Sequence, residues 1–279
     1  MSNKAMKTIH FDKMQCTGNG YLYVDARNRT IDNPQALAVR MSDVKFGVGS
    51  DGLVLILNSS IADFRMRMFN ADGSESAMCG NASQCIGKYV YEKKLTDKTV
   101  ITLETASGIK TLWLHIVGDK VHKISVDMDI PRLEARDIPV KYPDATNVPL
   151  QGMNFTCVSM GNPHAVTFVD NVTDFDVETI GKIIENHPIF PERTNVEFVQ
   201  ILSSDRIRMR VWERGAGETL SCGTGACASL VAAVIKSNVE PRATIELAGG
   251  ELEVEWNRNT NKVTLTGSAE WVFNGKWKK

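Results

Sequence analysis

The sequence lacks several features that would place it in a large class of proteins. Its charges nearly cancel, with 32 Lys and Arg against 33 Asp and Glu, so composition does not indicate the broad positive face of a nucleic-acid binder. Its most apolar run, Ala226–Ile235, is well short of the roughly 20 residues that a helix needs to cross a bilayer. We therefore expect no nucleic-acid partner and no membrane insertion, and a small-molecule partner fits better.

The N-terminus shows no targeting signal. Lys4 and Lys7 are not followed by the apolar stretch of a secretory signal peptide. We therefore expect a cytoplasmic protein.

The cysteines do not follow a disulfide or zinc pattern. A chain of 279 residues that is rich in core residues does not need disulfide staples, so the six cysteines are expected to be free thiols. Cys79 and Cys85 are six residues apart, Cys222 and Cys227 are five apart, and no histidine lies beside either pair. These spacings are not typical of zinc ligands, and we predict no metal.

An internal repeat decides the predicted fold. The length suggests about two domains, and shifting the sequence by 143 residues superimposes similar segments without a gap. The coincident pairs are Gly18-Asn19 with Gly161-Asn162, Arg65-Met66-Arg67 with Arg208-Met209-Arg210, Glu75 with Glu218, and Cys79-Gly80 with Cys222-Gly223. The prediction is an α/β fold of the α+β type, with two pseudo-symmetric domains from an internal duplication.

Prolines and a glycine interrupt the pattern near Pro139–Gly152, which places the expected boundary between domains 1–140 and 141–279. We leave open that the last strand packs back on the first domain.

Each copy predicts strands followed by one clear helix. Phe64–Phe69 and Ile207–Trp212 alternate apolar residues with arginine, the period of a strand with one wet face. After Cys79 and after Cys222, apolar and small residues recur at the spacing of a helix buried on most sides. The prediction is a strand-rich sheet wrapped around a buried helix in each domain.

Each copy thus places a cysteine and a glycine where a helix begins. The N–H groups and the helix dipole favour an anion there, so we expect a lowered thiol pKa and a seat for a carboxylate. Gly80 and Gly223 allow close approach of a ligand because they lack Cβ. The other four cysteines, Cys16, Cys85, Cys157 and Cys227, are expected to be buried small hydrophobes.

Two opposed thiols suit inversion of a carbon centre. If the copies are related by an approximate two-fold axis, Cys79 and Cys222 face each other across an inter-domain cleft, which is the expected active site. One thiolate then removes a proton from a tetrahedral carbon, and the opposite thiol returns one to the other face. The pair should titrate as a coupled unit.

Several further blocks stand out along the chain: Phe11–Asn19, Gly47–Leu53, Phe69–Glu75, Cys79-Gly80-Asn81, Gly161–His164, Arg193–Phe198 and Val211–Ala228. With these blocks in this order, the chain resembles the diaminopimelate epimerase family over nearly its full length. The resemblance implies a cofactor-independent isomerase that interconverts LL- and meso-diaminopimelate for lysine and peptidoglycan synthesis. It also implies an amino-acid ligand and a homodimer.

The resemblance also assigns roles to residues of this sequence. Cys79 and Cys222 would be the catalytic base and acid, with His164 and Glu213 supporting them near the reacting carbon. The substrate-binding residues would be Asn19, Asn70, Gly80, Asn81, Asn162, Asn195, Glu213, Arg214, Gly223 and Thr224.

The sequence departs from the family pattern at three places, and these departures bear on the substrate. Gly20 stands where aspartate is usual, Asp43-Val44-Lys45 replaces Asp-Arg-His, and Ala82-Ser83-Gln84 replaces a glycine and a later arginine. We therefore keep as alternatives a racemase of another amino acid, such as histidine or proline, and a non-catalytic amino-acid-binding protein.

The sequence does not indicate a dinucleotide or a pyridoxal phosphate cofactor. Gly47–Gly52 fits the dinucleotide fingerprint G-x-G-x-x-G, but a polar stretch precedes it and an apolar strand follows, whereas the fingerprint needs a strand before and a helix after. No lysine is singled out for pyridoxal phosphate. We predict no cofactor.

Overall fold

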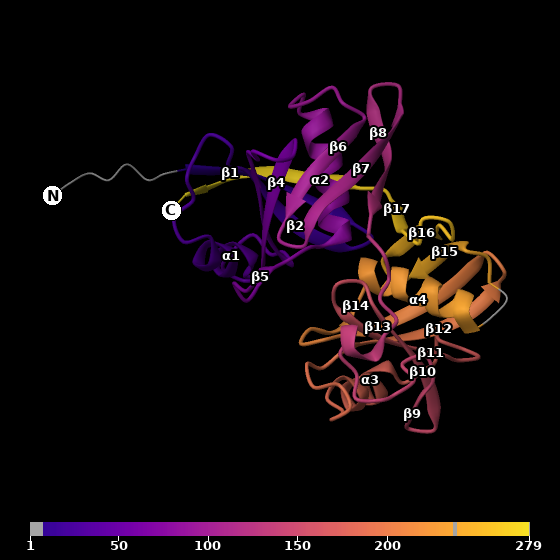
Figure 1. The fold of residues 1–279 in the computed structure, drawn as a ribbon. Helices are drawn as coiled ribbons and strands as arrows, with labels where there is room; N and C mark the ends of the chain where they lie inside the picture. Colours follow the sequence, from indigo (N-terminus) through magenta and orange to yellow (C-terminus); the bar gives the residue numbers. More distant parts are fainter. Residues whose placement is uncertain (1–7, 237–238, 279) are drawn as a thin grey trace. The chain divides into compact units, whose positions relative to one another are not determined.

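The computed structural model describes residues 8–236 and 239–278, and their contacts form two compact units (Figure 1). Unit 1 comprises residues 8–124 and 268–278 of the described chain, and unit 2 comprises residues 125–236 and 239–267. The expectation about Lys4 and Lys7 lies outside the described residues. Each unit combines a mixed sheet with helices, so the predicted α+β class is confirmed.

Unit 1 contains most of the first half of the chain and the last strand. Its elements are β1 (Thr8–Cys16), β2 (Asn19–Asp25), α1 (Pro34–Ser42), β3 (Gly52–Leu57), β4 (Phe64–Asn70), β5 (Glu75–Ser76), α2 (Gly80–Glu92), β6 (Val100–Thr105), β7 (Gly108–Val117), most of β8 (Lys120–Asp127) and β18 (Glu270–Lys278).

Unit 2 repeats this order of elements. They are the short helix η1 (Ala135–Asp137), β9 (Val148–Leu150), β10 (Met153–Ser159), β11 (Pro163–Phe168), α3 (Val177–Glu185), β12 (Asn195–Ser203), β13 (Arg206–Glu213), β14 (Gly217–Thr219), α4 (Gly223–Lys236), β15 (Arg242–Leu247), β16 (Gly250–Trp256) and β17 (Val263–Gly267). The strands predicted at 64–69 and 207–212 and both predicted helices are confirmed.

The strands of the two units pair in the same order. In unit 1 the strands pair in the order β18, β1, β2, β3, β4, β6, β7. In unit 2 the order is β9, β10, β11, β12, β13, β15, β16, β17. Tyr21 opposes Gly52 in one parallel pair, and His164 opposes Asn195 in the other, so the 143-residue shift also holds in the register of this parallel pair.

Helices α2 and α4 are buried within their own units. Ten residues of α2, from Gly80 to Val90, and ten of α4, from Gly223 to Ala233, are buried. Helix α4 contacts strands from β10 to β17, so its sheet curves around it, as Figure 1 shows for the orange part of the chain. Each fully buried Leu or Val side chain contributes about 1.5–3 kcal/mol relative to exposure, which holds the start of the helix in a defined place.

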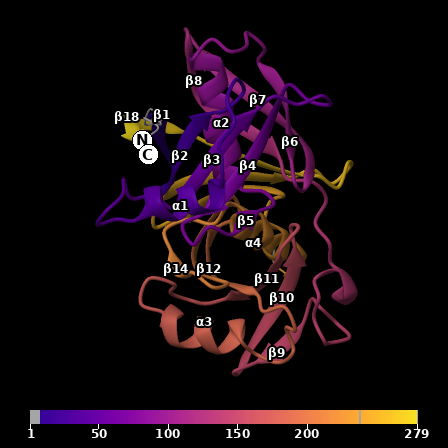
Figure 2. The ribbon, with the colours of Figure 1, turned by 90° about the vertical axis from the view of Figure 1, so that its left-hand side faces the viewer.

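The last strand belongs to unit 1. Strand β18 pairs antiparallel with β1, with Thr8 opposite Lys278 and Gln15 opposite Glu270 (Figure 2). In unit 2 the same position beside β10 is filled by β9, which precedes β10 in the chain. Two different parts of the sequence therefore complete the same edge in the two units.

The contacts divide the chain after residue 124, earlier than the expected boundary between 140 and 141. Residues 125–140 lie in unit 2 because Ile138 and Val140 are buried in its core. Arg132 also bridges Ser159 of β10.

The glycine-rich segment 47–52 ends one helix and enters a strand. The N–H of Gly47 donates to the carbonyl of Asp43, and those of Val48 and Gly49 donate to the carbonyl of Met41, at 2.8–3.1 Å. A Cβ at Gly47 would lie 2.4 Å from the Arg40 carbonyl oxygen. Glycine is therefore needed to close the end of α1, and the segment does not have the strand-to-helix context of a dinucleotide site.

None of the helices in the described ranges is long and apolar enough to span a membrane.

Candidate active site

Cys79 is the N-cap of α2. Its backbone is extended, and its Sγ accepts from the N–H of Ala82 at 3.5 Å. Its carbonyl accepts from the N–H and the hydroxyl of Ser83 at 3.0 and 2.9 Å. The half-buried sulfur therefore takes the place that Ser, Thr, Asp or Asn usually fills at a helix start.

Cys222 holds the matching position before α4, and its carbonyl accepts from the N–H of Ala226 at 2.9 Å. Its side chain is 7% exposed. Its sulfur lies 3.6 Å from the Thr224 hydroxyl. Both predicted catalytic cysteines thus lie at helix starts, each within its own unit.

Three ionisable side chains of unit 2 surround the Cys222 end of α4. His164 on β11 and Glu197 on β12 are fully buried, with Nδ1 and Oε1 2.6 Å apart. Glu213 at the end of β13 is half-buried. It accepts from the Thr219 hydroxyl at 2.5 Å, and its charge raises the pKa of Cys222.

A chain of hydrogen bonds joins the histidine to the sulfur. His164 Nε2 lies 3.1 Å from Asn162 Oδ1, and Asn162 Nδ2 donates to Thr224 Oγ1 at 3.2 Å. Because the Thr224 oxygen accepts from Asn162, its own hydrogen can point to the Cys222 sulfur. The structure therefore brings Asn162, His164, Cys222 and Thr224 together in unit 2, and the charge of Glu213 acts on Cys222.

The expected lowering of the thiol pKa is wrong for Cys222. Burial raises the pKa of Cys222 well above its usual value, and the charges of Glu213 and Glu197 raise it further. Hydrogen bonds from Thr224 and the Gly225 N–H act in the opposite direction and do not offset burial. Burial also raises the pKa of Glu213, although the bonds from Thr219 and Cys222 oppose this.

Asn195 and Arg214 lie together beside this group of residues. Asn195 Oδ1 accepts from the backbone N–H of Arg214, and its Nδ2 donates to the carbonyl of Pro163, both at 2.9 Å. The Arg214 guanidinium donates to the carbonyl of Glu192 at 2.9 Å. The Asn195 amide therefore places the backbone that carries Arg214.

The predicted unit 1 residues are spread over three elements. Asn81 in the first turn of α2 is 1% exposed and donates to the Thr17 hydroxyl at 3.4 Å, so the turn between β1 and β2 lies against the helix start. Asn19 follows that turn, and its buried Oδ1 has no hydrogen-bond partner among the described residues. Asn70, at the end of β4, donates to Ser74 at 3.0 Å.

The remaining four cysteines are free and buried, as predicted. Cys16 donates to Gln84 Oε1 at 2.9 Å. Burial raises the pKa of Cys16 and of Cys157 to about 12. These thiols have the character of small core residues.

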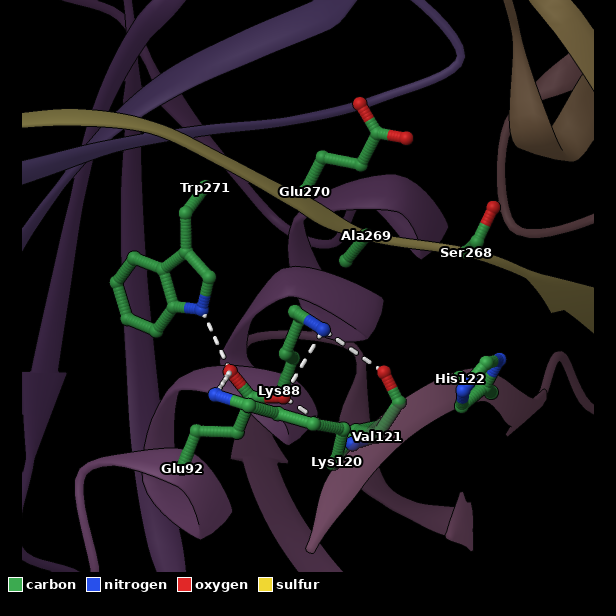
Figure 3. Close-up of a pocket in the computed structure, with 9 residues that line it drawn as sticks. All are labelled: Lys88, Glu92, Lys120, Val121, His122, Ser268, Ala269, Glu270 and Trp271. Carbon is green, nitrogen blue, oxygen red and sulfur yellow. Dashed lines mark hydrogen bonds and ion pairs between the residues drawn. The ribbon is translucent and has the colours of Figure 1, made fainter. Parts of the chain in front are cut away.

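A pocket of about 430 Å³ in unit 1 holds none of the predicted site residues (Figure 3). Its polar groups largely bond to one another. Glu92 accepts from Trp271 Nε1 at 2.8 Å, from the Val121 N–H at 3.1 Å and from Lys88 at 3.0 Å. Lys88 also donates to the Val121 carbonyl at 2.8 Å. The pocket therefore marks a place where α2, β8 and β18 are tied together.

In the part of the chain that the structure describes, no group of three or more His, Cys, Asp or Glu side chains could hold a metal ion.

Comparison with known proteins decides the family. The family model described as diaminopimelate epimerase matches residues 11–134 and 156–272. A diaminopimelate epimerase of Methanococcus maripaludis strain C6 is 54% identical over 274 residues, covering 96% of this chain and 99% of its own. The chain belongs to the diaminopimelate epimerase family. The resemblance inferred from the sequence is thereby confirmed.

Other relatives agree with this assignment. A diaminopimelate epimerase of Acetivibrio thermocellus is 51% identical, with coverage of 96% of this chain and 98% of its own. Solved structures share the fold at low identity. A PhzF-family protein of Bacillus anthracis has a TM-score of 0.71 at 18% identity, covering 98% of this chain and 100% of its own. A hydroxyproline epimerase of Agrobacterium vitis has 0.71 at 15%, covering 97% and 91%.

The departures from the epimerase family pattern have local explanations. The Gly20 N–H donates to Asp51 Oδ2 at 2.6 Å. Gln84 is buried between Cys16, from which it accepts, and the carbonyl of Ile124, to which it donates at 3.2 Å. Lys45 is exposed, and its N–H donates to Asp43 at 2.7 Å. None of these contacts involves Cys79 or Cys222.

Sequence reasoning missed Glu197 as a member of the site. The residue lay inside one block of the family resemblance but received no role. Its signal was a carboxylate between Val196 and Phe198, in a strand of five consecutive buried residues. A charged residue in such a run needs a buried partner, and His164 is that partner.

Proposed function

We propose that this protein interconverts LL- and meso-diaminopimelate without a cofactor, by proton transfer between two cysteines and the α-carbon. The observation that carries the proposal is the placement of Cys79 and Cys222 at matching helix starts, in a chain about half identical to diaminopimelate epimerases.

The proposed step exchanges one proton at carbon. The thiolate of one cysteine removes the α-hydrogen as a proton and becomes a thiol, which leaves the electron pair on the carbon. The thiol of the other cysteine then delivers its proton to the opposite face and becomes a thiolate. The configuration inverts, and a proton transfer between the two sulfurs by way of solvent restores the starting state.

The substrate's reacting carboxylate is proposed to lie at the two helix starts. The first N–H groups of a helix have no partner in its own ladder, and those of Gly80, Asn81, Gly223 and Thr224 belong to such positions. These donors stabilise the charge that develops on the carboxylate side of the carbanion. Asn19 completes this set.

The distal amino-acid end is proposed to bind Asn70, Asn162, Asn195, Glu213 and Arg214. The Arg214 guanidinium suits a carboxylate because its planar fork can donate two bonds, and Glu213 suits an ammonium group. Because Asn195 Oδ1 accepts from the Arg214 N–H, we assign Asn195 the task of holding Arg214.

Glu213 and His164 are proposed to support Cys222. Burial favours the thiol form of Cys222, so its deprotonation needs a nearby acceptor. The charge of Glu213 acts on the pKa of this thiol, and we assign Glu213 the role of that acceptor. His164 holds Asn162 and through it Thr224, the hydroxyl beside the sulfur.

We further propose that the protein works in the cytoplasm as a homodimer, in lysine and peptidoglycan synthesis. Its ligand is then a small amino acid rather than a nucleic acid or a membrane.

The deciding experiment offers the protein several amino acids in deuterated buffer and follows deuterium into the α-carbon. Diaminopimelate should gain label, whereas histidine and proline should not. Uptake into another amino acid alone would replace the substrate, and binding without uptake would favour a non-catalytic binding protein.

A second measurement tests whether both sulfurs reach one carbon. Mild oxidation should inactivate the enzyme through a Cys79–Cys222 disulfide, found by peptide mapping, and a thiol reductant should restore activity. Inactivation without this cross-linked peptide would count against a shared carbon.

A further inference from the structure

We propose that Glu197 is a positioning residue for the Cys222 half of the reaction. Its carboxylate holds the His164 ring, which orders Asn162 and Thr224 up to the sulfur. This inference rests on the proposed function, because it requires Cys222 to exchange a proton with the substrate.

The burial of Glu197 is the first argument. Its Oε1 lies 2.6 Å from His164 Nδ1, both side chains are fully buried, and its Oε2 has no hydrogen-bond partner among the described residues. A buried carboxylate with an unpaired oxygen is costly to keep. A residue kept at such a cost requires an explanation other than packing.

The direction of the hydrogen bonds is the second argument. His164 Nδ1 lies 2.6 Å from Glu197 Oε1, and Nε2 lies 3.1 Å from Asn162 Oδ1. Both neighbours are oxygen acceptors when Glu197 is ionised, so His164 donates to both in its imidazolium form, with a hydrogen on each ring nitrogen. Asn162 donates to Thr224, and the Thr224 hydroxyl can then donate to the Cys222 sulfur 3.6 Å away. In this series each side chain donates to the next one toward the Cys222 sulfur. Glu197 holds the first member of the series, His164.

Unit 1 provides the third argument. At the 143-residue shift, Val54 stands where unit 2 has Glu197, and Ala82 stands where unit 2 has Gly225. A Cβ at Gly225 would lie 2.7 Å from Glu197 Oε1. In unit 1 the corresponding strand and helix start form with the apolar pair Val54 and Ala82. The fold therefore does not require a carboxylate at the position of Glu197.

The test compares Glu197→Gln with the wild-type enzyme. The amide keeps the shape but lacks the charge, so kcat for diaminopimelate interconversion should fall about 10-fold or more. KM should change less than kcat, because Glu197 reaches the proposed substrate-binding residues Asn162 and Thr224 only through His164. The His164 ring N–H proton should also move to higher field in the NMR spectrum, since its acceptor is weaker.

Glu246→Gln is the matched control. It removes a carboxylate from the same unit, one that pairs with Arg206 and Arg208 instead, and kcat should stay within about twofold. If Glu197→Gln does not fold, the double variant Glu197→Val with Gly225→Ala introduces the pair that unit 1 already carries, and it should show the same fall in kcat.

The outcomes separate this inference from the proposed function. A wild-type protein that leaves the α-hydrogen of diaminopimelate unexchanged overturns the proposed function and, with it, the inference. An active wild type with a folded Glu197→Gln variant of unchanged kcat, or with a change in KM alone, overturns only the role of Glu197.

Discussion

The two units share a frame but differ in the chemistry around their helix-start cysteines. Arg67 bonds Glu75 through two nitrogens at 2.7 and 2.9 Å, and Arg210 bonds Glu218 in the same way at 2.7 and 3.1 Å. These pairs link β4 to β5 and β13 to β14, directly before each cysteine.

The side chains that face the helix starts do not follow this symmetry. Unit 2 carries His164, Glu197 and Glu213, and unit 1 carries Tyr21, Val54 and Asn70 at the same shift. The duplicated fold therefore places Cys79 and Cys222 at similar positions, but only Cys222 is surrounded by a histidine and two carboxylates of its own unit at these matching positions. The following predictions test how far the symmetry extends.

The largest effect is expected from the symmetric pair itself. Replacing either Cys79 or Cys222 with alanine should lower interconversion at least about 100-fold, because in the proposed mechanism each sulfur is the base in one direction and the acid in the other. Initial rates measured from both LL- and meso-diaminopimelate check this. Near-normal turnover in one variant would show that only one unit supplies a catalytic group.

Gly225→Ala should destabilise unit 2 by about 1–3 kcal/mol, because the new methyl group meets Glu197 Oε1 at 2.7 Å and the Cys222 sulfur at 3.3 Å. The reverse change in unit 1, Ala82→Gly, should cost about 1 kcal/mol or less. Urea unfolding of both variants checks the difference. Adding Glu197→Val should restore part of the loss, and no loss in Gly225→Ala would contradict the predicted clash.

The two arginines should differ in spite of their matching ion pairs. Arg210 also donates to the carbonyls of Val172, Thr173 and Phe175 at 2.8–3.1 Å, whereas Arg67 lies over the Phe69 ring. Arg210→Ala should therefore cost about 2 kcal/mol and Arg67→Ala about 0.5–1 kcal/mol in unfolding free energy. Equal losses would mean that the extra carbonyl bonds contribute nothing.

The smallest effect concerns Glu92, which stands where unit 2 has Ile235. Burial raises its pKa, but bonds from Trp271, Lys88 and the Val121 N–H outweigh burial, so the net pKa is lowered. Its contribution to stability is present above the usual carboxyl pKa and is lost as pH falls through the lowered value.

Glu92→Gln should therefore reduce stability at pH 7 by about 1 kcal/mol, and the loss should vanish in acid. Unfolding curves from pH 7 to pH 3 check this. A loss that is independent of pH would show that the Glu92 charge is not the source.

Many of the strands and helices could be predicted, because the sequence patterns that indicate them are local. Strand β4 alternates arginine with apolar residues, and Ala82, Cys85, Ile86, Tyr89 and Val90 recur at helical spacing; all five are buried. The start of each helix followed from the repeat. The sequence analysis left open that the last strand packs back on the first domain, and the structure places it there. Its pairing with β1 could not be predicted, because two strands far apart in sequence carry no local sign of their pairing.

The sequence predicted which residues belong to the candidate site. It did not predict several of the interactions between them. The family resemblance named His164, Glu213 and Thr224, and the structure joins them to Cys222. The rise in the pKa of Cys222 was not predictable, because it depends on how deeply the sulfur is buried and on two carboxylates from other strands. The partner of His164 was missed for the same reason.

The sequence by itself determined the duplication, the class of fold, the helix starts at Cys79 and Cys222, and the family. These depend on periodicity, spacing and repeated blocks, which are properties of the chain read in order. Only the tertiary structure decided which unit receives the last strand, which carboxylate meets His164, and which form of the Cys222 thiol is favoured. Those properties depend on burial and on contacts between distant segments, and such contacts exist only once the sheet has curved around its helix.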